Sequence, residues 1–159
     1  MGADVDVRIA GAADLDVLAR LVGLFRDHLG RTTPVAADLR ASIATLLKDP
    51  GTEFFVAGSG LASCGYVQCR YRYSAWSSAP EAELEDVFVV HEARRQGVGV
   101  PLVEFAITRA AARGCRSIGL NTNERNVEAL ALYGRLGFRA ERELWNDGRQ
   151  LWLEKWIAT

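Results

Sequence analysis

The sequence has no excess of charge of either sign and no long apolar run. Its 159 residues include 19 Lys and Arg against 20 Asp and Glu, for a net charge of −1. This balance argues against a basic nucleic-acid binder, because affinity for a duplex depends on neutralising many phosphates. No apolar stretch approaches the roughly 20 residues that span a bilayer. We therefore expect neither nucleic acid nor a membrane as a partner.

Cysteine is scarce, and its spacing has no pattern. Cys64, Cys69 and Cys115 are odd in number and show neither paired nor metal-ligand spacing, so we expect no disulfide framework and no metal site. The first six residues are acidic and lack the charged-then-apolar order of a signal peptide. These features predict reduced thiols in a cytoplasmic protein.

The chain has an ordinary apolar content but an uneven distribution of charge. Hydrophobic residues make up 49%, and we find no repeat or low-complexity tract, which predicts a single domain over residues 1–159. Residues 61–93 carry a net charge of −3 and residues 94–142 carry +5. The two segments are either ordinary solvated faces or neighbouring sites that prefer opposite charges.

Hydrophobic periodicity predicts an α/β (α+β) domain with four helices and a mixed, mostly antiparallel twisted sheet of about seven strands. The predicted order is β-α-α-β-β-β-α-β-α-β-β, with a loop over Ser74–Ala82 and an Asn-Asp-Gly turn between the last two strands. Strands are predicted at 5–9, 53–57, 63–73, 83–90, 117–122, 138–144 and 150–157. The first helix is predicted to open at Ala13-Asp14 and stop at Gly30, and the second to follow Pro34 and end near Asp49-Pro50-Gly51. The third is predicted from just after Gly99 to about Arg113, and the fourth at 126–136.

The first motif is Arg94-x-x-Gly97-x-Gly99, between a predicted strand and a predicted helix. Glycines allow the backbone to approach a ligand closely, and the N–H groups at a helix start favour an anion such as a pyrophosphate. The motif lacks the Gly-Lys-Ser/Thr of a Walker loop and the third glycine of the dinucleotide fingerprint. By itself it also fits a plain tight turn.

The second motif runs from Asn126 to Phe138. Asn126 stands where an N-cap is expected, and Tyr133 lies two turns later on the same helical face, with Ala129 between them. Alone, Tyr133 also fits a core aromatic residue.

The two motifs in this order resemble the GNAT superfamily of acetyl-CoA-dependent N-acetyltransferases, and the resemblance covers nearly the whole chain. It implies a single-domain GNAT fold and an acetyl-CoA cofactor. The stretch Leu84-Glu85-Asp86-Val87-Phe88-Val89 most resembles small-amine acetyltransferases, including polyamine enzymes. The expected acceptor is therefore a primary amine of a small cation such as a polyamine or an aminoglycoside, attacked directly in a ternary complex.

The resemblance also implies roles for individual residues. Tyr133 would protonate the departing thiolate, and Glu85 would take the proton from the attacking ammonium. The strand backbone would pair with the pantetheine arm, the glycine turn would hold the pyrophosphate, and the helix start at Asn126 and Ala129 would adjoin the arm. The residues expected to bind the cofactor are Val87, Phe88, Val89, Arg94, Arg95, Gln96, Gly97, Val98, Gly99, Asn126, Ala129 and Tyr133.

Several alternatives remain open from the residues themselves. Glu85 and Asp86 are adjacent on a strand and should point to opposite faces unless a bulge intervenes, so only one is expected at the reacting centre. We favour Glu85 as the base and place Asp86 with the acceptor. Tyr71, Tyr73 and Trp76 form either an aromatic wall beside the cation or ordinary sheet packing.

The function also has alternatives. The acceptor could instead be a protein N-terminus or a lysine, although Asn121 stands where N-terminal acetyltransferases often carry an acid. A non-catalytic acyl-CoA-binding domain would need neither Tyr133 nor Glu85. A homodimer through the C-terminal strands with Trp152 and Trp156 is a further expectation, since single exposed strand edges tend to be covered.

Overall fold

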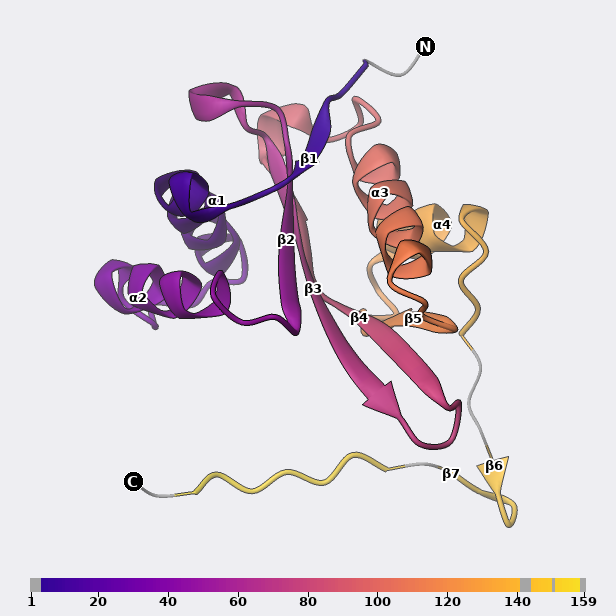
Figure 1. Cartoon of the computed structure of the whole chain (residues 1–159). Helices are drawn as coiled ribbons and strands as arrows, with labels where there is room; N and C mark the ends of the chain where they lie inside the picture. The colour runs from indigo at the N-terminus through magenta and orange to yellow at the C-terminus, as the bar shows by residue number, and fades with distance from the viewer. Residues whose placement is uncertain (1–3, 141–143, 150, 158–159) are drawn as a thin grey trace.

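A five-stranded sheet forms the centre of the protein (Figure 1). The computed structural model describes residues 4–140, 144–149 and 151–157. The strands lie in the order β1-β2-β3-β4-β5, antiparallel except for the parallel pair β4–β5. Their bounds are β1 Val7–Ile9, β2 Thr52–Ala57, β3 Gly65–Ser74, β4 Ala79–Val89 and β5 Ser117–Leu120.

Four helices cover the sheet, two on each face (Figure 1). On one face lie α1 Leu15–His28 and α2 Ala36–Leu46, and on the other lie α3 Gly99–Ala112 and α4 Val127–Arg135. Short 3-10 turns precede α1, join β2 to β3 and follow β4. The predicted fold class and the four helices are confirmed. Among the described residues, no helix is long and apolar enough to cross a membrane.

Each face of the sheet has its own apolar core. Leu18, Leu21, Phe54, Tyr66 and Phe88 are buried together on the face of α1 and α2. The core on the face of α3 combines side chains of that helix with strand residues at the positions between those of the first core. It includes Phe55, Val67, Leu84, Leu102, Val103 and Ala106. This alternation is what a sheet buried on both faces requires.

The prediction of about seven strands in one sheet is wrong in its count. In the described residues, β6 Leu144–Trp145 and β7 Gly148–Arg149 pair only with each other. The predicted turn is present, because Asn146 and Asp147 both have positive φ, as a two-residue hairpin turn requires. Residues 138–140 and 151–157 have no strand partner and so form no ladder, and the remainder of these predicted strands lies outside the described residues.

The predicted loop over Ser74–Ala82 is also wrong, because Ser74 belongs to β3 and Ala79–Ala82 belong to β4. The β3–β4 ladder continues to the pair Ser74 and Ala79, which leaves only residues 75–78 for the turn. Ala79 and Ala82 are buried in this extension. Pro80 made a strand improbable from sequence, yet its carbonyl accepts a hydrogen bond from Arg116 N, and a proline lacks only the donor.

Candidate active site

A β-bulge lies at the centre of β4. Gln68 of β3 is paired with Asp86, but the next residue, Cys69, is paired with Leu84. Glu85 is therefore an extra residue on β4, with no partner of its own in the ladder. Such a bulge changes which face the following side chains occupy.

The bulge brings Glu85 and Asp86 to the same face of the sheet. Leu84 before them and Val87 after them both pack against the core under α3. The two carboxylates lie between these residues and point to the opposite side, where Tyr66 Oη donates a hydrogen bond of 2.9 Å to Asp86 Oδ2. The sequence predicted that only one acid faces the reacting centre unless a bulge intervenes. A bulge is present, so both acids lie on the same face.

The two carboxylates differ in their partners. Glu85 accepts hydrogen bonds from Gln68 Nε2 at 2.9 Å and from Arg70 Nη1 at 2.8 Å, so its charge is compensated. Asp86 accepts from the Tyr66 hydroxyl and, among the described residues, pairs with no cation. Burial, with the neighbouring charge of Glu85, raises the pKa of Asp86 above its usual value although the tyrosine hydrogen bond opposes this. The pair therefore keeps a net negative charge.

β4 and β5 separate at these acids. They are paired only from Glu81 to Leu84 and from Ser117 to Leu120, after which β4 continues to Val89 while β5 ends. In the described chain, no strand pairs with residues 85–89 on the side of β5. The backbone of Val87, Phe88 and Val89 thus follows an opening between the two strands, where an extended ligand has access to main-chain groups.

The turn from Arg94 to Gly99 follows directly and leads into α3. Gly97 has φ of +77°, and Arg95 also adopts a positive φ of +63°, which is uncommon outside glycine. A Cβ on Gly99 would lie 3.3 Å from Leu132 Cδ2, so glycine allows α3 to start close to α4. No side chain caps the start of α3. Its first N–H groups, with the positive end of the helix dipole, suit a phosphate.

The side chains of this turn are held by neighbouring segments. Arg94 Nε donates to the carbonyl of Val89 at 3.0 Å, and its guanidinium lies 5.7 Å from the centre of the Phe88 ring. Arg95 forms an exposed ion pair of 3.2 Å with Glu128 of α4. Gln96 donates to a backbone carbonyl in the preceding 3-10 turn, and Val98 is buried in the α3 core. The Arg94 N–H donates to the carbonyl of His91 at 3.2 Å, so the N–H groups left for a ligand begin at Arg95.

The start of α4 agrees with the prediction for Asn126. Its Oδ1 accepts a hydrogen bond of 3.2 Å from Ala129 N, which confirms the N-cap. Two turns later Tyr133 is only 9% exposed, with its ring edge-on to Phe138 at 5.6 Å. Burial raises the pKa of the Tyr133 phenol. Within the part of the chain that the structure describes, its hydroxyl has no hydrogen-bond partner.

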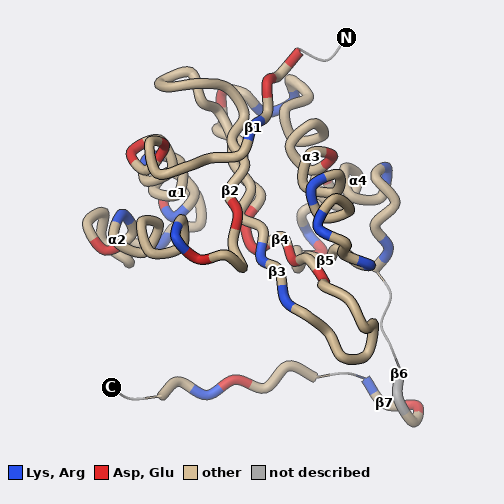
Figure 2. Tube along the Cα trace, in the orientation of Figure 1, with Lys and Arg blue, Asp and Glu red and all other residues tan. Residues whose placement is uncertain are grey.

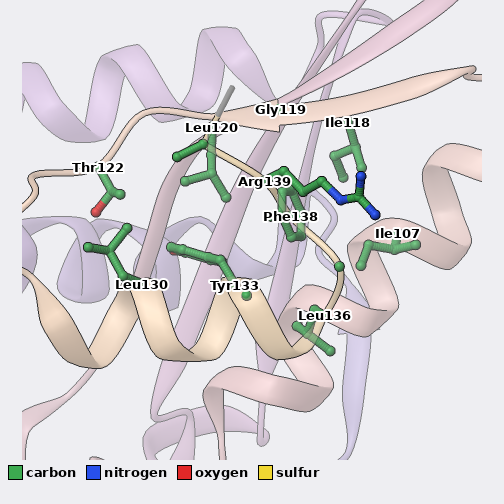
Figure 3. Close-up of a pocket in the computed structure, with 13 residues that line it drawn as sticks. Ile107, Ile118, Gly119, Leu120, Thr122, Leu130, Tyr133, Leu136, Phe138 and Arg139 are labelled. Carbon is green, nitrogen blue, oxygen red and sulfur yellow. The ribbon is translucent and has the colours of Figure 1, made fainter. Parts of the chain in front are cut away.

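Tyr133 also lines a cavity of about 530 Å³ between α4, β5 and the end of α3 (Figure 3). The cavity is mostly apolar, and in Figure 3 the ring of Tyr133 points toward Leu120, Leu130 and Thr122. The remaining wall comes chiefly from Ile107, Ile118, Leu136 and Phe138. We call this the β5–α4 groove.

The predicted aromatic wall is not assembled with the two acids. Tyr71 lies on the α3 face, where its hydroxyl donates to Glu53 at 2.8 Å and its ring stacks on the Arg113 guanidinium at 3.9 Å. Tyr73 is 72% exposed and Trp76 is 99% exposed near the tip of the β3–β4 hairpin. The structure therefore places Tyr71 on the opposite face from Glu85, and it leaves the other two in solvent.

The sequence reasoning missed the residues of β3 that surround the two acids: Tyr66, Gln68 and Arg70. They alternate at even positions, and this is the signal that could have identified them, because alternate residues of a strand share a face. The odd positions of the same strand, which carry the predicted aromatic wall, face α3 instead.

The two charged segments do not neutralise each other through the ion pairs of the described residues. Arg70 and Arg72 pair with Glu85 and Glu81 inside the acidic segment and leave its net charge unchanged, and Arg109 of the basic segment pairs with Glu53 outside both. Figure 2 shows basic residues recurring through α3, α4 and the segments around them, across the sheet from α1 and α2. The charge that remains near the site is local to Asp86 and to the exposed helix start.

Comparisons with known proteins identify the family. The model of the acetyltransferase (GNAT) family matches residues 22–138. The chain is 31% identical over 110 residues to aminoglycoside N(6')-acetyltransferase type 1 of Serratia marcescens, covering 67% of this chain and 75% of that protein. It is 31% identical over 109 residues to the thialysine N-epsilon-acetyltransferase of Sus scrofa, covering 67% of this chain and 61% of that enzyme.

The fold has matching solved structures. The crystal structure of a probable acetyltransferase superposes with a TM-score of 0.81 over 94% of this chain and 99% of the other, at 24% identity, a likeness of fold alone. Sequence match, fold and paired motifs agree: the chain belongs to the GNAT family and is an acetyl-CoA-dependent N-acetyltransferase.

Proposed function

We propose that the protein transfers an acetyl group from acetyl-CoA to a primary amine of a small cationic acceptor. The observation that carries this proposal is the bulge at Glu85, which brings two carboxylates to one face beside the opening between β4 and β5. A net negative site attracts a protonated amine and raises its local concentration. The aminoglycoside and thialysine relatives, named for acetylating amines, support the same class of acceptor.

The residues present fit acetyl-CoA. The N–H groups from Arg95 to Gly99 and the uncapped start of α3 would hold its pyrophosphate, because Gly97 and Gly99 carry no side chain that would cover them. The backbone of β4 from Val87 to Val89 would bind the pantetheine arm along the opening. When bound, acetyl-CoA supplies the thioester carbonyl that the amine attacks.

Two side chains of this chain would move protons. An alkylamine is protonated at neutral pH and must lose a proton before it attacks, and Glu85, directly or through water, would accept that proton on a carboxylate oxygen. The hydroxyl of Tyr133 would donate its proton to the departing sulfur. A phenol with a raised pKa stays protonated at neutral pH, so its proton is available when negative charge develops on the departing sulfur.

Asp86 would bind the ammonium rather than deprotonate it. It is the less exposed acid of the pair, and Tyr66 fixes one of its oxygens. Because Glu85 is already compensated by Arg70, an arriving cation meets its strongest unbalanced charge at Asp86. This division of roles separates acceptor binding from proton removal.

The experiment is a steady-state assay that follows free thiol with acetyl-CoA and a panel containing a polyamine, an aminoglycoside, a thialysine-like amino acid and lysine- or N-terminal peptides. We expect turnover with at least one small cation. With the best acceptor, Glu85→Gln should lower kcat about 10²- to 10⁴-fold with little change in KM. Asp86→Asn should chiefly raise the acceptor KM.

The two isosteric variants serve as controls for each other, since each removes one charge from the same face. Turnover of peptides alone would replace the small acceptor with a protein one. Equal effects of both variants on kcat and KM would refute the proposed division of roles.

A further inference from the structure

The face of the sheet that carries the two acids of the proposed site continues as a polar surface toward the start of β4. Ala82 and Leu84 are buried in the core under α3. Glu81 and Glu83 alternate with them along the strand and therefore point to the other side of the sheet. These two glutamates thus share a face with the proposed reacting centre.

A cavity of about 290 Å³ lies on this face between β4 and β5. In the parallel ladder, Glu83 is opposite Gly119, and the position of a Cβ on Gly119 has no neighbour within 4 Å. The missing side chain leaves the middle of the cavity open. Its polar lining consists of Arg72, Glu81, Glu83, Ser117 and Asn121.

The charges around the cavity are not balanced. Arg70 is opposite Glu83 in the β3–β4 ladder but forms its ion pair with Glu85, at 2.8 Å. Arg72 approaches Glu81 at 3.8 Å. In the described part of the chain, the exposed carboxylate of Glu83 forms no hydrogen bond or ion pair. Two carboxylates and one guanidinium give the cavity a net negative charge, which suits a cation.

The cavity also offers neutral hydrogen-bond acceptors. Ser117 and Asn121 of β5 provide a hydroxyl and an amide oxygen, and neither side chain forms a hydrogen bond with another described residue. An alkylammonium group has three N–H donors. Glu83 with these two oxygens therefore matches the hydrogen-bonding capacity of one ammonium group.

The separation along β4 decides how the cavity and the reacting centre are related. Glu83 precedes Glu85 by two residues and Asp86 by three, so at about 3.3 Å per residue the two places are about 7–10 Å apart. One ammonium group cannot contact both. A single molecule with two amino groups at this separation can.

We propose that this cavity, which we call the Glu83 subsite, binds a second ammonium group of the acceptor, so that the enzyme selects molecules with two or more amines over monoamines. The inference rests on the proposed function, in which Asp86 binds the amine that receives the acetyl group. The chemistry that the subsite recognises, a second ammonium on the same molecule, is shared by linear polyamines and aminoglycosides. A monoamine occupies the reacting centre and leaves the subsite to water.

The test compares α,ω-diaminoalkanes of increasing length with the monoamine of the same carbon chain, together with an aminoglycoside. Release of free thiol measures turnover, and calorimetry with the free protein measures binding. We expect kcat/KM to be at least about fivefold higher for the best diamine than for its monoamine, with the optimum at a nitrogen separation of about 7–10 Å. Glu83→Gln should raise KM for that diamine about fivefold and change the monoamine by less than about twofold.

Two further variants separate charge, space and net charge. Glu104→Gln is the matched control, because Glu104 is an exposed glutamate of α3 on the opposite side of the sheet. It should leave the preference for diamines intact. Gly119→Val should reduce the preference without removing a charge. Its side chain points into the cavity, because Ile118 and Leu120 on either side belong to the core under α3.

The outcomes distinguish the subsite from the proposed function. Equal kcat/KM for diamines and monoamines, or a preference that Glu83→Gln leaves unchanged, would overturn the subsite while amine acetylation stands. Tighter binding of diamines that Glu83→Gln weakens, without turnover of any amine, would support the subsite and refute the function. Binding and turnover of no amine would overturn both. A preference confined to the linear diamines or to the aminoglycoside would support the subsite and identify which of the two sources supplies the second ammonium.

Discussion

Removing the hydroxyl of Tyr133 should separate catalysis from stability. Tyr133 is nearly buried, its ring packs edge-on against Phe138, and its hydroxyl has no hydrogen-bond partner among the described residues. Tyr133→Phe keeps the ring and its contacts. Because no protein hydrogen bond is broken, the free energy of unfolding should change by less than about 0.5 kcal/mol.

The effect on turnover should be much larger. General acid catalysis by a positioned side chain contributes about 10²- to 10⁴-fold, so kcat should fall by this factor, equivalent to about 3–5 kcal/mol in the barrier. The acetyl-CoA KM should be nearly unchanged. Burial raises the pKa of Tyr133, so the phenol stays protonated through neutral pH and should produce no loss of activity below about pH 10.

The assay is the release of free thiol, measured together with thermal unfolding of the same preparations. Tyr66→Phe is a control of the same chemistry, because Tyr66 is fully buried but donates its hydroxyl to Asp86. That variant should lose about 1–3 kcal/mol in its free energy of unfolding, because the Asp86 carboxylate loses the hydrogen bond from Tyr66. A Tyr133→Phe enzyme with kcat within twofold of wild type would refute the assignment of the acid.

Further predictions concern the phosphate turn, the partly buried ion pair of Glu53 with Arg109, and salt. Gly97→Val should weaken acetyl-CoA binding in calorimetry at least about tenfold, whereas Gly114→Val, at a similar positive φ and with open space around it, should cost a comparable strain of roughly 1–3 kcal/mol without affecting affinity. Burial raises the pKa of Glu53, but hydrogen bonds from Arg109 and Tyr71 outweigh it and leave the pKa below its usual value. This lowered pKa stabilises the folded protein above the pKa that Glu53 has in the unfolded chain, and the stabilisation is lost as pH falls through the pKa of the folded state. Arg109→Ala should therefore lower the free energy of unfolding at pH 7 by about 1–3 kcal/mol and make that free energy decline less steeply in acid. Denaturant titrations at several pH values would measure both effects. Finally, kcat/KM for a cationic acceptor should fall with ionic strength, and an unchanged value would contradict electrostatic attraction at Asp86.

The parts of the site that sequence could predict are local in the chain. Asn126 caps α4 through a residue three positions away, and Gly97 provides a positive φ inside a six-residue turn. Both depend on propensities that act within one turn of helix or loop. The helix order and the mixed sheet followed from periodicity for the same reason. Short-range physics was sufficient for these features.

The features that were wrong or missed depend on pairing between distant segments. Whether residues 151–157 form a strand depends on a partner edge, which the alternation of this segment cannot supply. The extension of β4 into the region predicted as a loop depends on its ladder with β3, and the position of Tyr71 depends on which face α3 covers. In a strand buried on both sides, both alternating sets of residues are apolar, so the sequence pattern does not show which set faces which helix pair. Tertiary packing decides between them.

The bulge at Glu85 is a local irregularity of one strand whose consequence depends on pairing between β3 and β4. An uninterrupted strand would have placed one acid under α3, where no cation or solvent would compensate it, at a large cost in free energy. One extra residue instead turns both carboxylates toward the more open face and leaves Val87 in the α3 core. The nearly neutral chain, with a net charge of −1, therefore contains a local negative site, and the register of β4 against β3 determines where its two acids lie. Asp86 faces the side of α1 and α2, whereas the turn proposed to hold the pyrophosphate leads into α3 on the other side. In the proposed function, acceptor and cofactor would therefore approach the opening from opposite faces and meet where β4 and β5 part.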